Sequence, residues 1–247
     1  MIAFRNLQKS FGEKRVLRGV SFEVADGEVF FIIGASGVGK SVLIKHLVGL
    51  LRPDGGRISI DGQDITDLDE RQMFAVRKKC AMVFQHATLF DSMSCVDNVA
   101  LPLRKHFRIG AAEGRRRALE LLERVQMGDF ADRFPAELGD GMRKRVAIAR
   151  ALTLQPRYVL FDEPTTSLDP VSARRVDRLI RQLSDELGVT SIVVSHDLTS
   201  IFSIADRIVM LYHGEVLLLG TPDEFRNSAD PIIQQFIHGR AEGPIDA

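Results

Sequence analysis

A glycine-rich segment of this 247-residue chain reads Gly34-Ala35-Ser36-Gly37-Val38-Gly39-Lys40-Ser41 and fits the pattern G-x-x-x-x-G-K-[ST]. The apolar run 29–33 precedes it, and a stretch with apolar residues at helical spacing follows it, namely Val42, Leu43, Leu47 and Leu50. A buried strand, a glycine turn and a helix in this order form a phosphate cradle, because backbone N–H groups and the positive helix end face one anion. We expect Lys40 to reach the β- and γ-phosphates of a nucleotide and Ser41 to bind Mg²⁺ through its hydroxyl.

A second apolar strand is expected at residues 158–163, and it ends in the carboxylates Asp162 and Glu163. Two adjacent carboxylates after a strand, coupled to a phosphate cradle, form the Walker B pattern. Asp162 is placed to hold Mg²⁺, directly or through water, and Glu163 is placed to polarise an attacking water. The pair therefore predicts a catalytic site rather than a solvated turn.

Two more apolar segments end in polar side chains. Residues 81–84 end at Gln85, whose amide is placed to reach metal or water in a crevice. Residues 191–195 deliver His196 to the carboxyl end of a strand, where open α/β sheets collect their ligand groups. His196 is therefore a candidate for contact with the γ-phosphate.

Short strands are expected at residues 2–7, 20–24 and 57–60, where apolar residues alternate or cluster between turn signals. They predict a small antiparallel sheet beside the nucleotide core. Phe11 falls in the loop between the first two strands, and taken alone it reads as a core aromatic rather than a ligand contact. A last hairpin is expected at residues 208–211 and 216–219.

The pattern changes to helices between residues 86 and 154, with helices expected at 96–103, at 111–125 and from about 140. Asp169 and Pro170 open a later helix that Gly188 ends. After a short helix at 232–237, the tail is expected to be flexible unless it docks. We therefore divide the chain into an α/β core with its antiparallel sheet (1–85 and 155–220), a helical part (86–154) and a C-terminal tail (221–247).

Composition excludes several classes of protein. Lys plus Arg and Asp plus Glu both number 33, so no overall field draws the chain to nucleic acid or to an anionic membrane. Cys80 and Cys95 lie outside any C-x-x-C spacing, which argues against a disulfide framework or a structural zinc site and fits a reducing compartment. The start does not read as a signal peptide, and no apolar run approaches about 20 residues. We expect a protein that works at a membrane only if something else holds it there.

The motifs, in this order along nearly the whole chain, resemble the ATP-binding subunit of ABC transporters. The resemblance implies an α/β fold of the ABC-type P-loop NTPase class, with a RecA-like core, a small antiparallel β subdomain and a helical subdomain. It implies ATP and Mg²⁺ as cofactors, adenine stacked on Phe11, and catalysis by Lys40, Glu163 and His196. Mg²⁺ would contact Ser41, Gln85 and Asp162. The nucleotide would contact Phe11, Gly34, Ala35, Ser36, Gly37, Val38, Gly39, Lys40, Ser41, Gln85, Gly139, Asp140, Gly141 and Asp169.

In that family two copies stack head to tail, and a Leu-Ser-Gly-Gly signature of one covers the nucleotide of the other. The matching place here reads Leu138-Gly139-Asp140-Gly141-Met142, followed by Arg143-Lys144-Arg145. An aspartate about 5 Å from a phosphate charge would cost about 3 kcal/mol at an effective dielectric of 20. Alternatively, Asp140 caps the helix and the three cations offset its charge. We favour a working ATPase, because the hydrolytic residues are all present. A nucleotide-binding regulatory module that does not turn over is the rival interpretation.

Residues 87–93 and 97–103 resemble the MlaF/Mkl branch, which powers MCE-linked lipid transporters, and residues 239–244 are similar to the partner-clasping tail of MlaF. This resemblance implies an integral-membrane permease that docks on residues 86–104, an MCE-domain lipid-binding subunit and a small accessory cytoplasmic subunit. It places the chain in the cytoplasm, on the inner face of the inner membrane of a Gram-negative envelope.

Other solutes and other ATPase classes are the alternatives. An importer of amino acids or metal ions is the nearest, because the permease and not this chain selects the substrate. A DNA-repair or chromosome-structure ATPase would need a long coiled-coil insertion or a basic patch, and the sequence has neither. We therefore expect no nucleic-acid partner.

Overall fold

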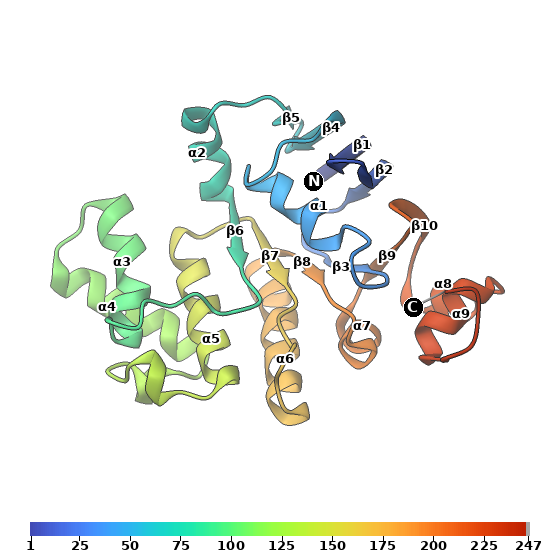
Figure 1. Ribbon diagram of the computed structural model, residues 1–247. Coiled ribbons are helices and arrows are strands. Elements are labelled where there is room, and N and C mark those ends of the chain that lie inside the picture. The colour runs from blue at the N-terminus through green and yellow to red at the C-terminus, as the bar shows by residue number, and fades with distance from the viewer. Residues whose placement is uncertain (246–247) are drawn as a thin grey trace.

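Two β-sheets and the helices packed around them make up the computed structural model, which describes residues 1–245 (Figure 1). The larger sheet has six strands in the order β10-β9-β3-β8-β7-β6. Strands β9, β3, β8, β7 and β6 run parallel, and β10 pairs antiparallel with β9 at the edge. Their bounds are β3 (Val29–Ile33), β6 (Cys80–Val83), β7 (Tyr158–Asp162), β8 (Thr190–Val194), β9 (Arg207–Tyr212) and β10 (Glu215–Gly220).

This strand order brings the motif residues to one edge of the sheet. The cradle follows β3, Gln85 follows β6, Asp162 ends β7, and His196 follows β8. Because neighbouring parallel strands have their carboxyl ends at the same edge, segments more than a hundred residues apart in sequence meet there. Strands β3, β7 and β8 have five residues each, and every one of them is buried, as expected of parallel strands that are covered on both faces.

The smaller sheet is antiparallel, as predicted, with strands in the order β2-β1-β4-β5. Its first two strands, β1 (Ile2–Phe11) and β2 (Lys14–Val24), are longer than the sequence indicated. Irregular pairing between Phe4 and Leu7 and between Lys9 and Ser10 breaks the alternation of apolar and polar residues, so the pattern hid the outer half of each strand. The remaining strands are β4 (Gly55–Ile60) and β5 (Gln63–Asp64).

Phe11 corrects one of our expectations. It ends β1 and pairs with Lys14, so it lies in a strand and not in a loop. Its side chain is 47% exposed, so it is not a core aromatic.

Helices cover both faces of the larger sheet. Helix α1 (Lys40–Leu47) and the residues Met73 and Val76 of α2 (Glu70–Lys79) share a hydrophobic cluster with the smaller sheet and one face of the larger one. The other face packs against the remaining helices: α3 (Cys95–Phe107), α4 (Ala111–Arg124), α5 (Asp140–Ala151), α6 (Pro170–Leu187), α7 (Leu198–Ile204), α8 (Pro222–Arg226) and α9 (Pro231–His238).

The helices agree with the predicted pattern except in α1, α7 and α8. Leu50 lies beyond the end of α1 and is 54% exposed, so it does not belong to the apolar stripe of that helix. Helices α7 and α8 were not predicted, because their seven and five residues are too few for periodicity to appear. The tail after α9 docks on its own chain: the Ile245 N–H donates to Gln235 Oε1 (2.7 Å), and the Tyr212 hydroxyl donates to the Pro244 carbonyl (3.3 Å). Asp246 and Ala247 of the predicted tail lie outside the described residues.

The division at residues 85/86, 154/155 and 220/221 stays a prediction. Helices α3, α4 and α5 do lie between residues 86 and 154. They share one continuous hydrophobic cluster with the sheet residues Phe31 and Phe161 and with Phe225 of α8, so the apolar core runs across all three boundaries.

The two cysteines, Cys80 and Cys95, are buried and free. Burial raises the pKa of Cys80 to about 12 and that of Cys95 to about 11, so both thiols stay protonated at neutral pH. Within residues 1–245, no helix has the length and apolar character needed to cross a bilayer.

Asn98 fixes the long connection between β6 and α3 (Figure 1). Its side chain lies fully buried in α3, accepts a hydrogen bond from the Phe90 N–H (2.8 Å) and donates to the carbonyls of Phe90, Met93 and Ser94 at 3.0–3.1 Å. One amide therefore satisfies four backbone groups of a segment that has no strand or helix of its own.

We expect Asn98→Ala to lower the free energy of unfolding by about 2–3 kcal/mol, because buried backbone groups lose their partner. Equilibrium urea unfolding followed by circular dichroism measures the change. Asn227→Ala is the matched control, since Asn227 is exposed, and we expect it to stay within about 0.5 kcal/mol of the parent. Equal stability of the two variants would contradict this role of Asn98.

Candidate active site

The phosphate cradle opens into a hollow of about 810 Å³ at the carboxyl edge of the larger sheet. Side chains from both sheets line it together with the cradle. Those that the sequence predicted are Phe11, Gly34, Ala35, Ser36, Gly37, Gly39, Lys40, Ser41, Gln85, Glu163 and His196. Lining residues that it did not predict are Lys14, Val16, Val42, Thr166 and Phe236.

The glycines of the cradle are required by its backbone path. Gly34 and Gly39 have φ of +140° and +106°, which L side chains rarely adopt. A Cβ on Gly34 would lie 2.3 Å from the carbonyl oxygen of Leu211, and one on Gly39 would lie 2.8 Å from Leu17 Cδ2. The tight curl of the loop therefore depends on the absence of side chains at these positions.

Lys40 places a buried cation at the floor of the cradle. Its side chain is 8% exposed, and its ammonium donates to the carbonyls of Gly34 (2.9 Å) and Ala35 (3.0 Å). Burial lowers the pKa of Lys40, and the charges of Glu163 and Asp162 oppose that shift. Among the described residues, no carboxylate lies within 4.0 Å of this ammonium, which leaves it suited to an anionic ligand.

Ser41 and Asp162 form the candidate metal-binding pair. The Ser41 hydroxyl donates to Asp162 Oδ1 at 2.6 Å, and Asp162 is 7% exposed, so it lies beneath the hollow rather than on its wall. In residues 1–245, no group of three His, Cys, Asp or Glu side chains is placed to hold a metal alone. Mg²⁺ usually takes one or two protein oxygens and completes its shell with water and substrate phosphate, so this pair fits Mg²⁺ bound together with a nucleotide.

Glu163 is held in a defined orientation beside the cradle. Its backbone has φ of +51°, an uncommon conformation for a residue with a side chain, and its N–H donates to the Val194 carbonyl (2.9 Å). The Oε2 atom accepts from the Thr166 hydroxyl (2.9 Å) and lies 2.9 Å from His196 Nδ1. The carboxylate therefore faces the hollow with two neighbours that fix it, as a general base requires.

Thr166 is a contact that the sequence analysis missed. It follows Glu163 by three residues, a spacing that puts a hydroxyl back toward the first side chain of a turn. That spacing is the only signal for it in the sequence, and hydroxyls at this spacing are common in ordinary turns.

The signature segment lies on a different hollow. Gly139, Asp140, Gly141 and Asp169 line a space of about 620 Å³ that shares no lining residue with the cradle hollow. Asp169 caps α6 as predicted, by accepting from the N–H groups of Val171 and Ser172 at 2.9 Å. The structure therefore brings nine of the fourteen predicted cofactor contacts together and leaves these four apart. Val38 lines an adjoining hollow, which shares Ala35, Ser36 and Gly37 with the cradle hollow and extends to Pro244 and Ile245.

Asp140 does not cap its helix, so the capping interpretation is wrong. Gly139 occupies the N-cap of α5, without a side-chain bond, because the preceding backbone places Asp140 as the first helical residue. Asp140 forms an ion pair with Arg143, which offsets its charge as expected. Lys144 bonds the Gln85 carbonyl, and Arg145 bonds the carbonyls of Val125 (3.2 Å) and Gln126 (3.0 Å), so neither pairs with Asp140.

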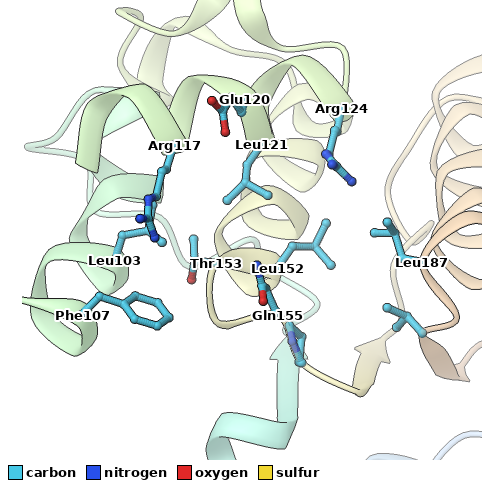
Figure 2. A pocket seen from close by; sticks show the side chains of 12 residues that line it. Leu103, Phe107, Arg117, Glu120, Leu121, Arg124, Leu152, Thr153, Gln155 and Leu187 are labelled. Atoms are coloured by element: carbon cyan, nitrogen blue, oxygen red, sulfur yellow. The ribbon is translucent and has the colours of Figure 1, made fainter. Parts of the chain in front are cut away.

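A separate hollow of about 510 Å³ lies between α3, α4 and the end of α6 (Figure 2). Leu103, Leu121 and Leu187 form part of its apolar wall, and Arg117 and Arg124 project from α4 beside them. None of the motif residues lines it, so it does not belong to the candidate active site.

Comparison with known proteins places this geometry in a family. Residues 17–166, more than half of the chain, match the profile of the ABC transporter family. The chain is 38% identical to the probable ribonucleotide transport ATP-binding protein Mkl of Mycobacterium leprae, over 99% of its own length and 70% of the relative's. It is also 38% identical to the intermembrane phospholipid transport system ATP-binding protein MlaF of Haemophilus influenzae, over 99% and 93%. It is 40% identical to the methionine import ATP-binding protein MetN of Brucella abortus, over 96% and 64%.

Solved structures agree with the sequence relatives. A dimeric ATP-binding cassette in a post-hydrolysis state, bound to ADP and Pi, superimposes with a TM-score of 0.82 at 34% identity. The match covers 90% of this chain and 99% of that one. The family profile, the relatives that match nearly all of this chain and the shared fold lead to one conclusion: the chain belongs to the ABC transporter family and is an ATPase.

Proposed function

We propose that two copies of this chain stack head to tail, bind two ATP molecules with Mg²⁺ and close as they hydrolyse them. The separation of the motifs between two hollows supports this proposal more than any other observation. The cradle and the hydrolytic pair line one hollow, whereas Gly139–Gly141 line another. A second copy placed in the opposite direction would bring its signature to the cradle of the first. The dimeric cassette among the similar structures is consistent with such an arrangement.

The roles within one half-site follow from the contacts described above. Lys40 would bind the β- and γ-phosphates, and the exposed ring of Phe11 would stack on adenine at the other part of the same hollow. Ser41 and Asp162 would hold Mg²⁺ with Gln85 nearby, and the metal would supply charge neutralisation on the phosphate oxygens. Glu163 would take a proton from the attacking water while His196 and Thr166 keep its carboxylate oriented.

The alternative of a regulatory module that does not turn over depended on an uncompensated charge at Asp140. The ion pair with Arg143 weakens this alternative, because a positive guanidinium lies beside the carboxylate that would otherwise repel the phosphate. Asp140 also lies in the first turn of α5, where the helix dipole favours a negative charge. We therefore retain hydrolysis as the proposed activity of the closed dimer.

The proposed partner is an integral-membrane permease that docks on residues 86–104, so that the chain lies in the cytoplasm at the inner face of the inner membrane. A hollow of about 330 Å³ lies beside the first part of this segment, between Gln85–Leu89 and the signature end of α5. A permease element seated there would touch both the Gln85 loop and α5. Docking on this surface would therefore couple the permease to the nucleotide.

Phospholipid or another lipid is the proposed cargo, in a Gram-negative envelope and with an MCE-domain subunit and a small accessory subunit as further partners. The likeness to MlaF over 93% of that protein supports this choice. Import of another solute is the second candidate, because MetN, named for methionine import, is 40% identical to this chain.

For the activity, we expect Glu163→Gln to lower ATP turnover by about 10²–10⁴-fold, because an amide does not accept the proton of the water. The Kd for Mg-ATP should change by less than about twofold, because the amide keeps the shape of the carboxyl group. Phosphate release and isothermal titration measure the two quantities. Glu186→Gln, an exposed carboxylate of α6, is the matched control and should turn over normally. Near-normal turnover in the Glu163 variant would reject the assigned role.

For the cargo, we expect the chain, purified with its permease from its own membranes, to drive ATP-dependent transfer of a fluorescent phospholipid in proteoliposomes. The Lys40→Ala complex should transfer no phospholipid above the level without ATP, because the cradle loses its buried cation. Uptake of radiolabelled methionine by the same vesicles is the competing readout. Methionine uptake without phospholipid transfer would contradict the lipid proposal and leave the ATPase proposal standing.

A further inference from the structure

Lys144 is a buried lysine of α5 whose contacts the roles above do not use. Its side chain is 4% exposed, and it follows Asp140 by one helical turn. The ammonium donates to the carbonyl of Gln85, and its nitrogen lies 3.4 Å from the carbonyl oxygens of Phe84 and Glu163. Among the described residues, no carboxylate lies within 4.0 Å of it.

These three carbonyls belong to the two segments that carry the chemistry. Phe84 and Gln85 follow β6, and Glu163 follows β7, so one ammonium joins the ends of neighbouring parallel strands. A lysine ammonium has three N–H donors and no acceptor, which matches three carbonyls. Lys144 also lines the hollow between the Gln85 loop and α5, with Asp140, Thr166 and Ser167. It therefore lies where the signature helix, the Gln85 loop and the turn after β7 meet.

The contact with Glu163 bears on catalysis through the backbone. Glu163 has φ of +51°, which directs its carbonyl toward α5 while its side chain faces His196 and Thr166. A conformation of this kind persists only where surrounding contacts favour it. Donation to the Glu163 carbonyl is such a contact, and it comes from the helix that carries Gly139–Gly141.

Burying the ammonium of Lys144 costs free energy, which argues that this side chain does more than fill space. Burial lowers the pKa of Lys144 to about 8, with the charges of Asp162, Asp140 and Glu163 opposing the shift. A methionine or leucine would fill the same volume without that desolvation cost. What an apolar side chain lacks is the ability to hold three carbonyls in place.

We propose that Lys144 is a positioning residue for ATP hydrolysis, which ties the backbone of Glu163 and Gln85 to the helix that presents Gly139–Gly141. The inference rests on the proposed hydrolysis at Glu163. Movement of α5 relative to the larger sheet would change the carbonyl contacts first, and through them the orientation of the Glu163 carboxylate. The placement of the signature helix would then control the rate of the chemical step without altering the affinity of the cradle for ATP.

The test compares Lys144→Met, which keeps the length of the side chain and removes its donors, with Lys144→Arg, which restores charge and donors. Lys105→Met, at an exposed lysine of α3, is the matched control. We measure kcat and KM for Mg-ATP with the full chain, and the Kd for Mg-ATP by isothermal titration in the Glu163→Gln background. We expect Lys144→Met to lower kcat by at least about tenfold with Kd within about threefold, and Lys144→Arg to recover most of kcat.

Thermal melting followed by circular dichroism separates loss of the carbonyl contacts from loss of the fold. If Lys144→Met unfolds, Lys144→Gln replaces it, because the shorter, uncharged amide has only two N–H donors for the three carbonyls, and we expect the same division between kcat and Kd. A folded variant with kcat within about twofold of wild type, or equal losses in kcat and ATP affinity that Lys144→Arg does not reverse, would overturn the role. Absence of hydrolysis in the wild-type chain would instead contradict the proposed function itself.

Discussion

The site depends on one buried ammonium group, that of Lys40, whose hydrogen-bond partners are two backbone carbonyls. The Lys40 ammonium is held at the edge of the sheet because the carbonyls of Gly34 and Ala35 bend back toward it, and that bend requires the positive φ of Gly34 and Gly39. Asp162 and Glu163 oppose the pKa shift that burial imposes, although neither forms an ion pair with the ammonium. The arrangement leaves a cation without an anion in direct contact, which is the electrostatic condition for binding phosphate.

The order of the parallel strands extends this condition to the whole site. Because β3 lies beside β8, β8 beside β7 and β7 beside β6, the cradle, His196, Glu163 and Gln85 reach one edge without any long loop. The signature helix packs on the same core but faces another hollow. A single chain therefore carries two unlike halves of the proposed site, and Lys144 of the signature helix bonds the Gln85 and Glu163 carbonyls beside the cradle. In this view the second copy completes the site, and Lys144 links the position of the signature helix to the backbone of Glu163.

The sequence predicted the parts of this structure in which local pattern and tertiary role coincide. Strands β3, β6, β7 and β8 have short apolar runs, and the sequence correctly places Gly34, Gln85, Asp162 and His196 at or just after their carboxyl ends. Prediction failed where contacts across the chain decide the outcome. Irregular pairing hid half of β1, so Phe11 was placed in a loop. The alternative in which Asp140 caps α5 is wrong, because the backbone path decides which residue is the N-cap. Lys144 and Arg145 were grouped with Arg143 as one basic run, whereas burial sends each to different carbonyls.

The most direct measurement of the central claim is ATP hydrolysis by mixtures of two variants that damage opposite halves of the site. Lys40→Ala disables the cradle, and Gly139→Glu adds a negative charge to the signature, where a side chain finds open space. In a head-to-tail dimer each variant alone should be inactive. An equal mixture should recover about a quarter of the wild-type rate, because half of the randomly formed dimers contain one intact site of two. Hydrolysis at the wild-type rate by the Gly139→Glu chain alone would contradict the account, since the cradle would then act without a partner's signature.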